Sequence, residues 1–189
     1  MKEKRLLLLI DCQYDFINGS LAVDGATDAM NALAEYIASH GKEYAAIAAT
    51  LDWHPAQHCS FKSVTSSGLW PVHCVQHTMG AAIYDPIIKN SPSDIIFFTK
   101  GNLADSDEYS IFANAVNGPR LAEFIADERF TQIDVCGLCG DYCVKESIDG
   151  LIKHGFGKIT SVLLPFTPSI DGGDTLLKFA NDFGIAIKR

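Results

Sequence analysis

Residues 5–16 read RLLLLIDCQYDF, in which an apolar run from Leu6 to Ile10 stops abruptly at Asp11. Five similar runs rich in Leu, Ile, Val and Phe recur along the chain, at residues 44–51, 94–99, 132–136, 158–164 and 185–188. Continuous apolar runs of this length are typical of strands that are covered on both faces. The first run therefore predicts a strand over Arg5–Ile10, and the series predicts a sheet of about six strands.

Apolar residues at helical spacing lie between these runs, within residues 26–38, 144–152 and 176–183. This alternation predicts an α/β fold of three layers, α/β/α, with a mostly parallel, Rossmann-like sheet. Ligands of such sheets bind beyond the carboxyl ends of the strands. Residues 54–90 have no clear period and carry four of the six histidines. A loop of that length is usually functional, and its aromatic residues argue against disorder.

The composition suits one enzyme-sized domain. The chain has 189 residues, of which 48% are hydrophobic, so we expect a single domain over residues 1–189. Fifteen Lys and Arg against 23 Asp and Glu give a net charge of −8, the wrong sign for nucleic acid or anionic lipid. The run Leu6–Ile10 is far shorter than a membrane span or a signal-peptide core. We expect a cytoplasmic protein with reduced cysteines, a small-molecule substrate, and neither nucleic acid nor membrane as partner.

Asp11 occupies the position where the first predicted strand opens into the expected crevice. An acidic side chain there is well placed to act as a general base, and Gln13, two residues on, points the same way. The alternative is that Asp11 only accepts hydrogen bonds from loop amides. This segment alone does not decide between the two interpretations.

The second run ends in Asp52-Trp53-His54, which has the spacing of two metal ligands. A strand period of two sends Asp52 and His54 to the same side, about 6 to 7 Å apart along the chain. The same loop offers a third ligand, and His73 is held by the stiff Trp70-Pro71 corner; the other candidates are His58 and His77. Two imidazoles and a carboxylate with open positions suit Zn²⁺ or Fe²⁺. The alternative for each histidine is an ordinary loop residue.

The fourth run, from Gln132, leads into CGLCGDYCV over residues 136–144, where a helix pattern begins. Asp141 is a candidate N-cap, which would place Cys143 in the first helical turn, where the helix dipole lowers a thiol pKa and free amides can receive an oxyanion. Cys143 is therefore a candidate nucleophile. A Cys136–Cys139 redox pair, a structural metal or cluster site, and ordinary packing are the alternatives.

Lys100 supplies the cation that a thiol–carboxylate pair needs. It closes the run over 94–99, so that Asp11, Lys100 and Cys143 each end or follow a different predicted strand. A positive charge between them would relieve the repulsion between a thiolate and a carboxylate. Alone, a lysine at a strand end is more often solvated, and its position relative to the other two residues is what singles it out.

Taken together, these motifs make the sequence similar to the nicotinamidase branch of the isochorismatase-like cysteine hydrolases. The resemblance covers nearly the whole chain and rests on five motifs in the family's order: D-x-Q-x-D-F over 11–16, D-x-H-P over 52–55, W-P-x-H-C-V-Q over 70–76, T-K-G over 99–101 and D-Y-C-V over 141–144. It implies an isochorismatase-like fold and amidohydrolase activity, the conversion of nicotinamide to nicotinate and ammonia through a cysteine thioester.

The resemblance also implies roles for individual residues. The catalytic triad would be Asp11, Lys100 and Cys143, and the oxyanion hole would use the amides of Cys139 and Cys143 around a cis Leu138-Cys139 peptide bond. The remaining implied residues are the metal ligands Asp52, His54 and His73, with His58 or Ser60 as an additional ligand, and the pocket walls Phe16, Trp70 and Tyr109. A divalent metal is implied, with zinc first and iron or manganese as alternatives.

Two segments depart from the family pattern, Cys139-Gly140 before the nucleophile motif and residues 164–171 after the fifth run. The nearest rival activity is hydrolysis of a carbamoyl or ureido compound, or of isochorismate, by the same fold. A redox or metal-binding module built on the cysteines is the rival from another class. The sequence does not decide which nicotinamide-like amide is preferred. It also leaves open whether the protein is a monomer or a homo-oligomer.

Overall fold

The computed structural model describes residues 3–189 and contains one six-stranded sheet. All neighbouring strands are parallel, in the order β3-β2-β1-β4-β5-β6. The strands are β1 (Arg5–Ile10), β2 (Ala46–Asp52), β3 (Ile95–Lys100), β4 (Gln132–Gly137), β5 (Thr160–Leu163) and β6 (Ala186–Lys188). The predicted α/β class and six-stranded parallel sheet are confirmed, and the bounds of β1 match the first apolar run.

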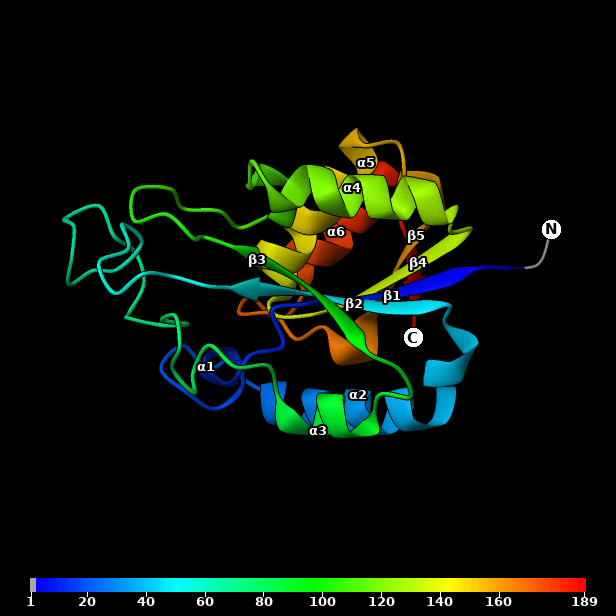
Figure 1. The fold of residues 1–189 in the computed structure, drawn as a ribbon, viewed down its shortest axis with the longest axis horizontal. Helices are drawn as coiled ribbons and strands as arrows, with labels where there is room; N and C mark the ends of the chain where they lie inside the picture. Colours follow the sequence, from blue (N-terminus) through cyan, green and yellow to red (C-terminus); the bar gives the residue numbers. More distant parts are fainter. Residues whose placement is uncertain (1–2) are drawn as a thin grey trace.

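Helices cover both faces of this sheet, which gives the three layers seen in Figure 1. The helices are α1 (Tyr14–Ile17), α2 (Ala26–His40), α3 (Asp85–Asn90), α4 (Asn117–Glu128), α5 (Lys145–Lys153) and α6 (Asp174–Phe183). Short 3-10 turns lie at Gly41–Glu43, Ile111–Ala113, Gly157–Ile159 and Leu164–Phe166, and a π-helical turn lies at Gly140–Val144.

The central strand β1 shows why its sequence is uniformly apolar. Leu7 and Leu9 pack into the core on the side of α2, whereas Leu6, Leu8 and Ile10 pack into the core on the side of α4, α5 and α6. All five side chains are fully buried. A strand that is covered on both faces has no position for a polar residue until it ends, and Asp11 marks that end.

The order of the strands reverses at β1, which lies between β2 and β4. Ile10 pairs with Thr50 on one side and with Gly137 on the other, and Asp52 pairs with Lys100. The strand ends that carry the sequence motifs therefore lie at one edge of the sheet, where the long loops gather (Figure 1). Such a switch point is where open α/β sheets bind ligands.

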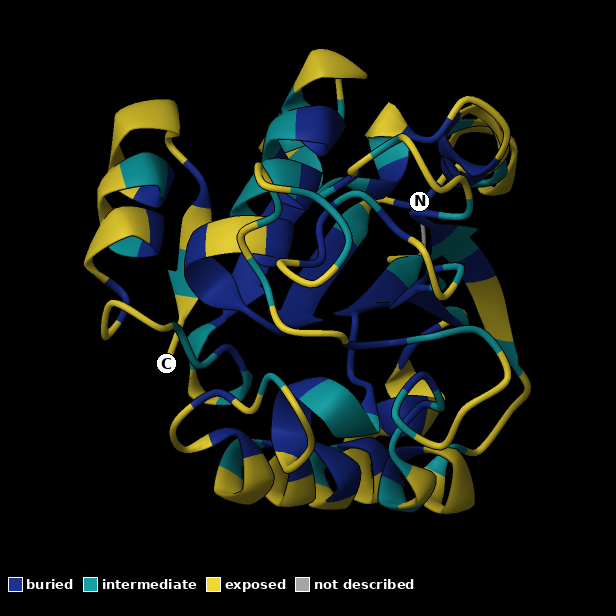
Figure 2. Cartoon of the chain, turned by 90° about the vertical axis from the view of Figure 1, so that its left-hand side faces the viewer, coloured by how far each residue is buried: buried dark blue, intermediate teal, exposed yellow. Residues whose placement is uncertain are grey.

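Two parts of the chain differ from the simple alternation expected from sequence. Helix α4 was not expected, because only Leu121 and Ile125 of its residues are large apolar side chains buried in the core. The segment 54–84 is an ordered loop without long elements, held by isolated bridges such as His54 with Val75 and Phe61 with Trp70. Figure 2 is a view onto the carboxyl ends of the strands and shows buried strands surrounded by partly exposed loops.

Among residues 3–189, none of the helices combines the length and apolar character that crossing a membrane would require.

Candidate active site

Three strand ends bring Asp11, Lys100 and Cys143 into contact. Asp11 follows β1, Lys100 is the last residue of β3, and Cys143 lies in the π-helical turn between β4 and α5. Lys100 Nζ lies 2.8 Å from Asp11 Oδ2 and donates a hydrogen bond of 3.7 Å to Cys143 Sγ. All three side chains are buried. The sequence motifs thus converge on an acid, an ammonium group and a thiol within one buried cluster.

Asp11 has few hydrogen-bond partners for a buried carboxylate. Thr50 donates a hydrogen bond of 2.7 Å to Asp11 Oδ1, and the Asp11 amide donates to the Thr50 carbonyl oxygen at 3.1 Å. Apart from the ion pair with Lys100, Asp11 Oδ2 accepts no hydrogen bond from the described residues, although it is buried. An incompletely bonded buried carboxylate has a high affinity for a proton.

Burial sets the protonation of the pair. Burial raises the pKa of Asp11, and this effect exceeds the lowering by the Lys100 charge. Burial likewise raises the pKa of the Cys143 thiol well above its ordinary value, against the opposing effect of Lys100. The resting thiol is therefore protonated, and nucleophilic attack requires a base. Asp11, whose carboxylate lies within 4.8 Å of Cys143 Sγ, is the candidate for that base.

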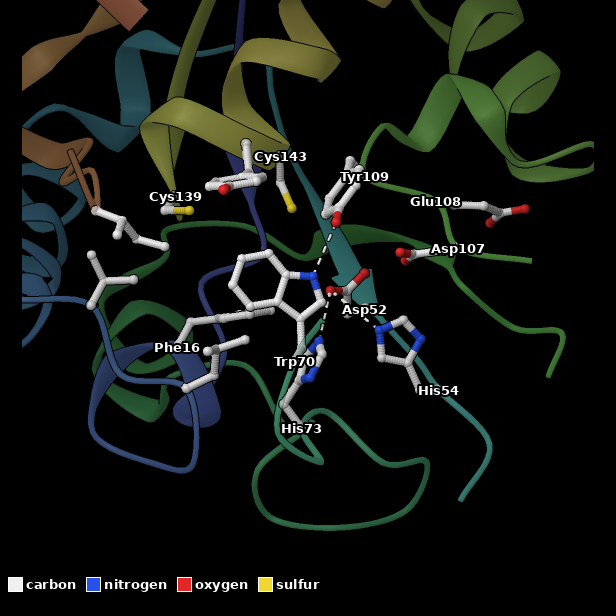
Figure 3. A pocket seen from close by; sticks show the side chains of 14 residues that line it. Phe16, Asp52, His54, Trp70, His73, Asp107, Glu108, Tyr109, Cys139 and Cys143 are labelled. Carbon is white, nitrogen blue, oxygen red and sulfur yellow. Dashed lines mark hydrogen bonds and ion pairs between the residues drawn. The ribbon is translucent and has the colours of Figure 1, made fainter. Parts of the chain in front are cut away.

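A second cluster, formed by Asp52, His54 and His73, lies directly beside the first. One ligand atom from each of the three residues lies within 4.8 Å of the others. His54 Nε2 is 3.5 Å and His73 Nε2 is 3.9 Å from Asp52 Oδ2. His54 is the first residue of the loop 54–84, and His73 lies further along the same loop (Figure 3).

The histidine tautomers fit metal binding. His54 Nδ1 lies 3.0 Å from the Gly101 carbonyl oxygen, and His73 Nδ1 lies 2.8 Å from the Pro71 carbonyl oxygen. Because a carbonyl oxygen only accepts hydrogen bonds, each Nδ1 carries the proton, and each Nε2 presents a lone pair to the cluster. Two neutral imidazoles and one carboxylate are a donor set for a divalent metal ion.

Asp52 joins the two clusters. Its Oδ2 faces the histidines, and its Oδ1 accepts a hydrogen bond of 2.5 Å from Lys100. Burial acts to raise the pKa of Asp52, but the pKa is lowered, chiefly by the positive charge of Lys100. Asp52 is therefore an ionised carboxylate, as a metal ligand must be. Lys100 lies between two aspartates, which raise its pKa although burial opposes them.

His58 and Ser60 lie beside this cluster but contact each other. His58 Nδ1 is 2.7 Å from Ser60 Oγ, and His58 Nε2 is 3.0 Å from the Ser106 carbonyl oxygen. The His58 ring stacks on His54 with centroids 3.9 Å apart. Both ring nitrogens of His58 are thus engaged, and the converging donor atoms are those of Asp52, His54 and His73.

The two clusters open into a cavity at the carboxyl ends of the strands. The predicted wall residues Phe16, Trp70 and Tyr109 line it, together with Cys143 and the metal-ligand cluster (Figure 3). Trp70 Nε1 donates a hydrogen bond of 3.0 Å to the Tyr109 hydroxyl, which fixes both rings. A flat aromatic ligand suits a pocket with these walls.

The peptide bond between Leu138 and Cys139 is cis, as the resemblance implied. Cys139 lines the cavity next to Cys143, and its amide donates no hydrogen bond to any described residue. Such an amide is available to a ligand oxygen.

The expected N-cap role of Asp141 is wrong. The chain enters the helix through the π-helical turn, whose N-cap is Cys139 and has no side-chain cap. The Asp141 carboxylate instead accepts hydrogen bonds of 3.1 and 3.2 Å from the amides of Ile170 and Asp171. These bonds hold the segment 164–171, which differs from the family pattern, against the turn that carries Cys143. Ile170 of this segment lines the cavity.

Sequence reasoning missed further residues that line the cavity, namely Leu21, Val23, Asp107, Glu108, Tyr142 and Ile170. Asp107 and Glu108 directly precede Tyr109 in the loop after β3, so their position beside a predicted wall residue was an available signal. Ile170 carried no such signal, because long-range hydrogen bonds from Gly140 to Pro168 and from Ile170 to Asp141 bring its segment to the cavity.

Comparisons with known proteins agree with this arrangement. The nicotinamidase of Escherichia coli (strain K12) is 35% identical over 173 residues, which cover 80% of this chain and 78% of the relative. A zinc complex of the pyrazinamidase of Pyrococcus horikoshii superimposes with a TM-score of 0.85 at 30% identity, covering 98% of this chain and 99% of the other. The yeast nicotinamidase bound to the inhibitor nicotinaldehyde gives a TM-score of 0.84 at 25% identity, covering 97% and 98%.

The model of the isochorismatase domain matches residues 5–161, which include the strand ends and loops that carry both clusters. This chain belongs to the isochorismatase domain family.

Proposed function

We propose that this protein is a nicotinamidase that hydrolyses nicotinamide to nicotinate and ammonia, with Asp11, Lys100 and Cys143 as its catalytic residues. The contact of these three side chains beside an aromatic-walled cavity is the observation that carries the proposal. The names of similar proteins support the substrate, since they are nicotinamidases and a pyrazinamidase.

Binding places the amide beside the nucleophile. Phe16 and Trp70 enclose the flat ring, and the Trp70–Tyr109 hydrogen bond keeps the wall in place. Asp52, His54 and His73 would hold a divalent metal, for which we propose zinc because a relative's structure is a zinc complex. When bound, the metal supplies a Lewis-acidic point for the pyridine nitrogen and thereby orients the ring.

The protein's own residues then carry the protons. Asp11 takes the proton from Cys143 Sγ as the sulfur attacks the amide carbon, and Lys100 stabilises the ion pair that results. The amides of Cys139 and Cys143 receive the negative charge on the carbonyl oxygen. Asp11 returns the proton to the departing ammonia, which leaves a nicotinoyl thioester on Cys143. Asp11 next deprotonates a water molecule, whose oxygen attacks the thioester carbon. The C–S bond then breaks, nicotinate is released, and Asp11 returns the proton to Cys143 Sγ.

The test is the release of ammonia and nicotinate from nicotinamide by purified protein, measured before metal stripping, after it, and after zinc is added back. We expect equimolar ammonia and nicotinate. We expect activity to be lost when the metal is stripped and to return when zinc is added. Failure of folded, zinc-loaded protein to release either product would overturn the proposal, and release of ammonia only from a carbamoyl or ureido compound would favour the rival amidohydrolase.

A redox module built on Cys136 and Cys139 is disfavoured by burial. Cys136 lies within β4 with no exposed surface, and burial raises its thiol pKa well above the ordinary value. A thiol of that kind is a poor partner for exchange.

A further inference from the structure

We propose that Glu108 is a positioning residue for the metal cluster, which it serves by holding the Gly101 backbone that orients His54. The inference rests on the proposed metal site of the nicotinamidase and concerns a residue outside the triad and the ligand set.

Glu108 is a buried carboxylate, and each of its two oxygens accepts at least one hydrogen bond. Its Oε2 accepts hydrogen bonds of 2.7 Å from the Gly101 amide and 2.8 Å from Asn114 Nδ2. Its Oε1 accepts a longer bond of 3.3 Å from Ser106 Oγ. The side chain is only 7% exposed, and Figure 3 shows its carboxylate turned away from Cys143. Glu108 therefore acts on the loop behind the cavity and not on the nucleophile.

Gly101 contacts Glu108 through its backbone N–H and His54 through its backbone carbonyl, which lie in two adjacent peptide groups joined at the Gly101 Cα. The Gly101 amide donates to Glu108, and the Gly101 carbonyl oxygen accepts the His54 Nδ1 proton at 3.0 Å. Gly101 has a φ of +61°, and a Cβ there would lie 2.3 Å from His54 Cε1. The residue must be glycine because the imidazole packs directly on its backbone. The position of the Gly101 backbone thus fixes the tautomer and the direction of His54.

Glu108 is itself held by the start of α4. Asn114 Oδ1 accepts hydrogen bonds of 2.8 Å from the Asn117 amide and 3.2 Å from the Val116 amide. Asn117 Nδ2 donates to the Thr99 carbonyl oxygen at 2.7 Å, next to the strand end that carries Lys100. The carboxylate therefore connects a helix, a strand end and the Gly101 turn.

The second histidine offers an internal contrast. His73 is oriented by the Pro71 carbonyl oxygen, which has no contact with Glu108 among the described residues. Loss of Glu108 should therefore disorder one ligand of three and leave the others in place. Loss of a residue that orients a metal ligand typically weakens metal binding by about 10-fold to 100-fold.

The experiment compares zinc affinity among variants by competition with a chromophoric chelator. Glu108→Gln keeps the size of the side chain but removes the charge that the Gly101 amide and Asn114 share, and Glu108→Asp shortens it. The matched control is Asp105→Asn, which removes an exposed acid from the same loop. We expect zinc dissociation constants about 10-fold or more above the wild-type value for both Glu108 variants and an unchanged value for the control.

Kinetics separate positioning from a general loss of structure. With saturating zinc, the Glu108 variants should show a raised KM for nicotinamide with kcat within a few-fold of wild type. Folded Glu108→Gln protein that binds zinc as tightly as wild type would overturn the inference. Hydrogen exchange of the Gly101 amide in wild-type protein tests it without any variant: we expect protection, and fast exchange would contradict the bond to Glu108.

These readouts separate the two proposals. Zinc affinity and amide exchange do not require turnover, so they decide the role of Glu108 even if nicotinamide is not the substrate.

Discussion

Two buried aspartates in the same central sheet have opposite surroundings. Asp134 lies toward the amino ends of β1 and β4, and its carboxylate accepts hydrogen bonds from five side chains: Arg5, Tyr44, Gln132, Ser161 and Lys188. Asp11 lies at the carboxyl ends and has, within residues 3–189, only Thr50 and Lys100 as side-chain partners. Asp134 thus has five side-chain donors, whereas Asp11 has one hydroxyl donor and one ion-pair partner.

The difference appears in the two pKa values. Burial acts to raise the pKa of Asp134, but hydrogen bonds from Lys188, Ser161 and Arg5 outweigh it and lower the pKa to about 2. At Asp11 burial prevails over Lys100, and the pKa is raised. A fully bonded carboxylate ties strands together, whereas an incompletely bonded one can take up a proton during a reaction.

Replacing the nucleophile should give the largest effect. Cys143→Ala removes the atom that forms the thioester, so we expect nicotinate formation to fall by about 10⁴-fold or more. Binding of nicotinamide, measured by calorimetry, should persist because the walls and the metal ligands remain. Cys59→Ala, outside the cavity lining, is the control and should keep wild-type activity. Substantial turnover by pure Cys143→Ala protein would refute the assignment.

Neutralising each aspartate should separate chemistry from stability. Asp11→Asn removes the proposed base and should lower kcat by about 10²-fold to 10⁴-fold. Asp134→Asn leaves the charges of Arg5 and Lys188 without their partner and should cost on the order of 2–3 kcal/mol of unfolding free energy, with kcat unchanged. Steady-state kinetics and urea unfolding of both variants test the contrast. If Asp134→Asn lowered kcat as much as Asp11→Asn does, the proposed difference between the two aspartates would be wrong.

The pH dependence of stability should carry the signature of Asp134. Its folded pKa of about 2 lies below the unfolded value of about 4, so its contribution is present above pH 4 and is lost as the pH falls toward 2. The difference in unfolding free energy between wild type and Asp134→Asn should shrink by about 2 kcal/mol between pH 6 and pH 2. A difference independent of pH would show that the charge of Asp134 is not what stabilises.

The smallest effect is expected from removing one of the five donors to Asp134. Lys188 is partly exposed, at 43% of its side chain, and is the partner nearest the carboxyl terminus. Lys188→Met should lower the unfolding free energy by at most about 1 kcal/mol, as expected for a partly solvated pair, and should leave activity unchanged. A loss of unfolding free energy as large as that of Asp134→Asn would mean that the Lys188 bond alone provides most of the stabilisation by Asp134.

The sequence predicted those parts of the molecule that depend on interactions between residues close together in the chain. Strand β1 followed from an unbroken apolar run, and the family motifs located Asp11, Lys100 and Cys143 at strand ends. Helix α4 was missed because its buried face is short. The roles of Asp141 and Glu108 were not predictable, since each depends on backbone amides that the fold brings from elsewhere in the chain. Long-range hydrogen bonds to the backbone leave no pattern in a single sequence.

The central claim is that the acyl group passes through Cys143, and partitioning with hydroxylamine tests it most directly. A nicotinoyl thioester should be captured by hydroxylamine, so wild-type protein should form nicotinohydroxamate at the expense of nicotinate while ammonia release continues. Formation of nicotinate alone at every hydroxylamine concentration, with unchanged ammonia release, would contradict a thioester on Cys143.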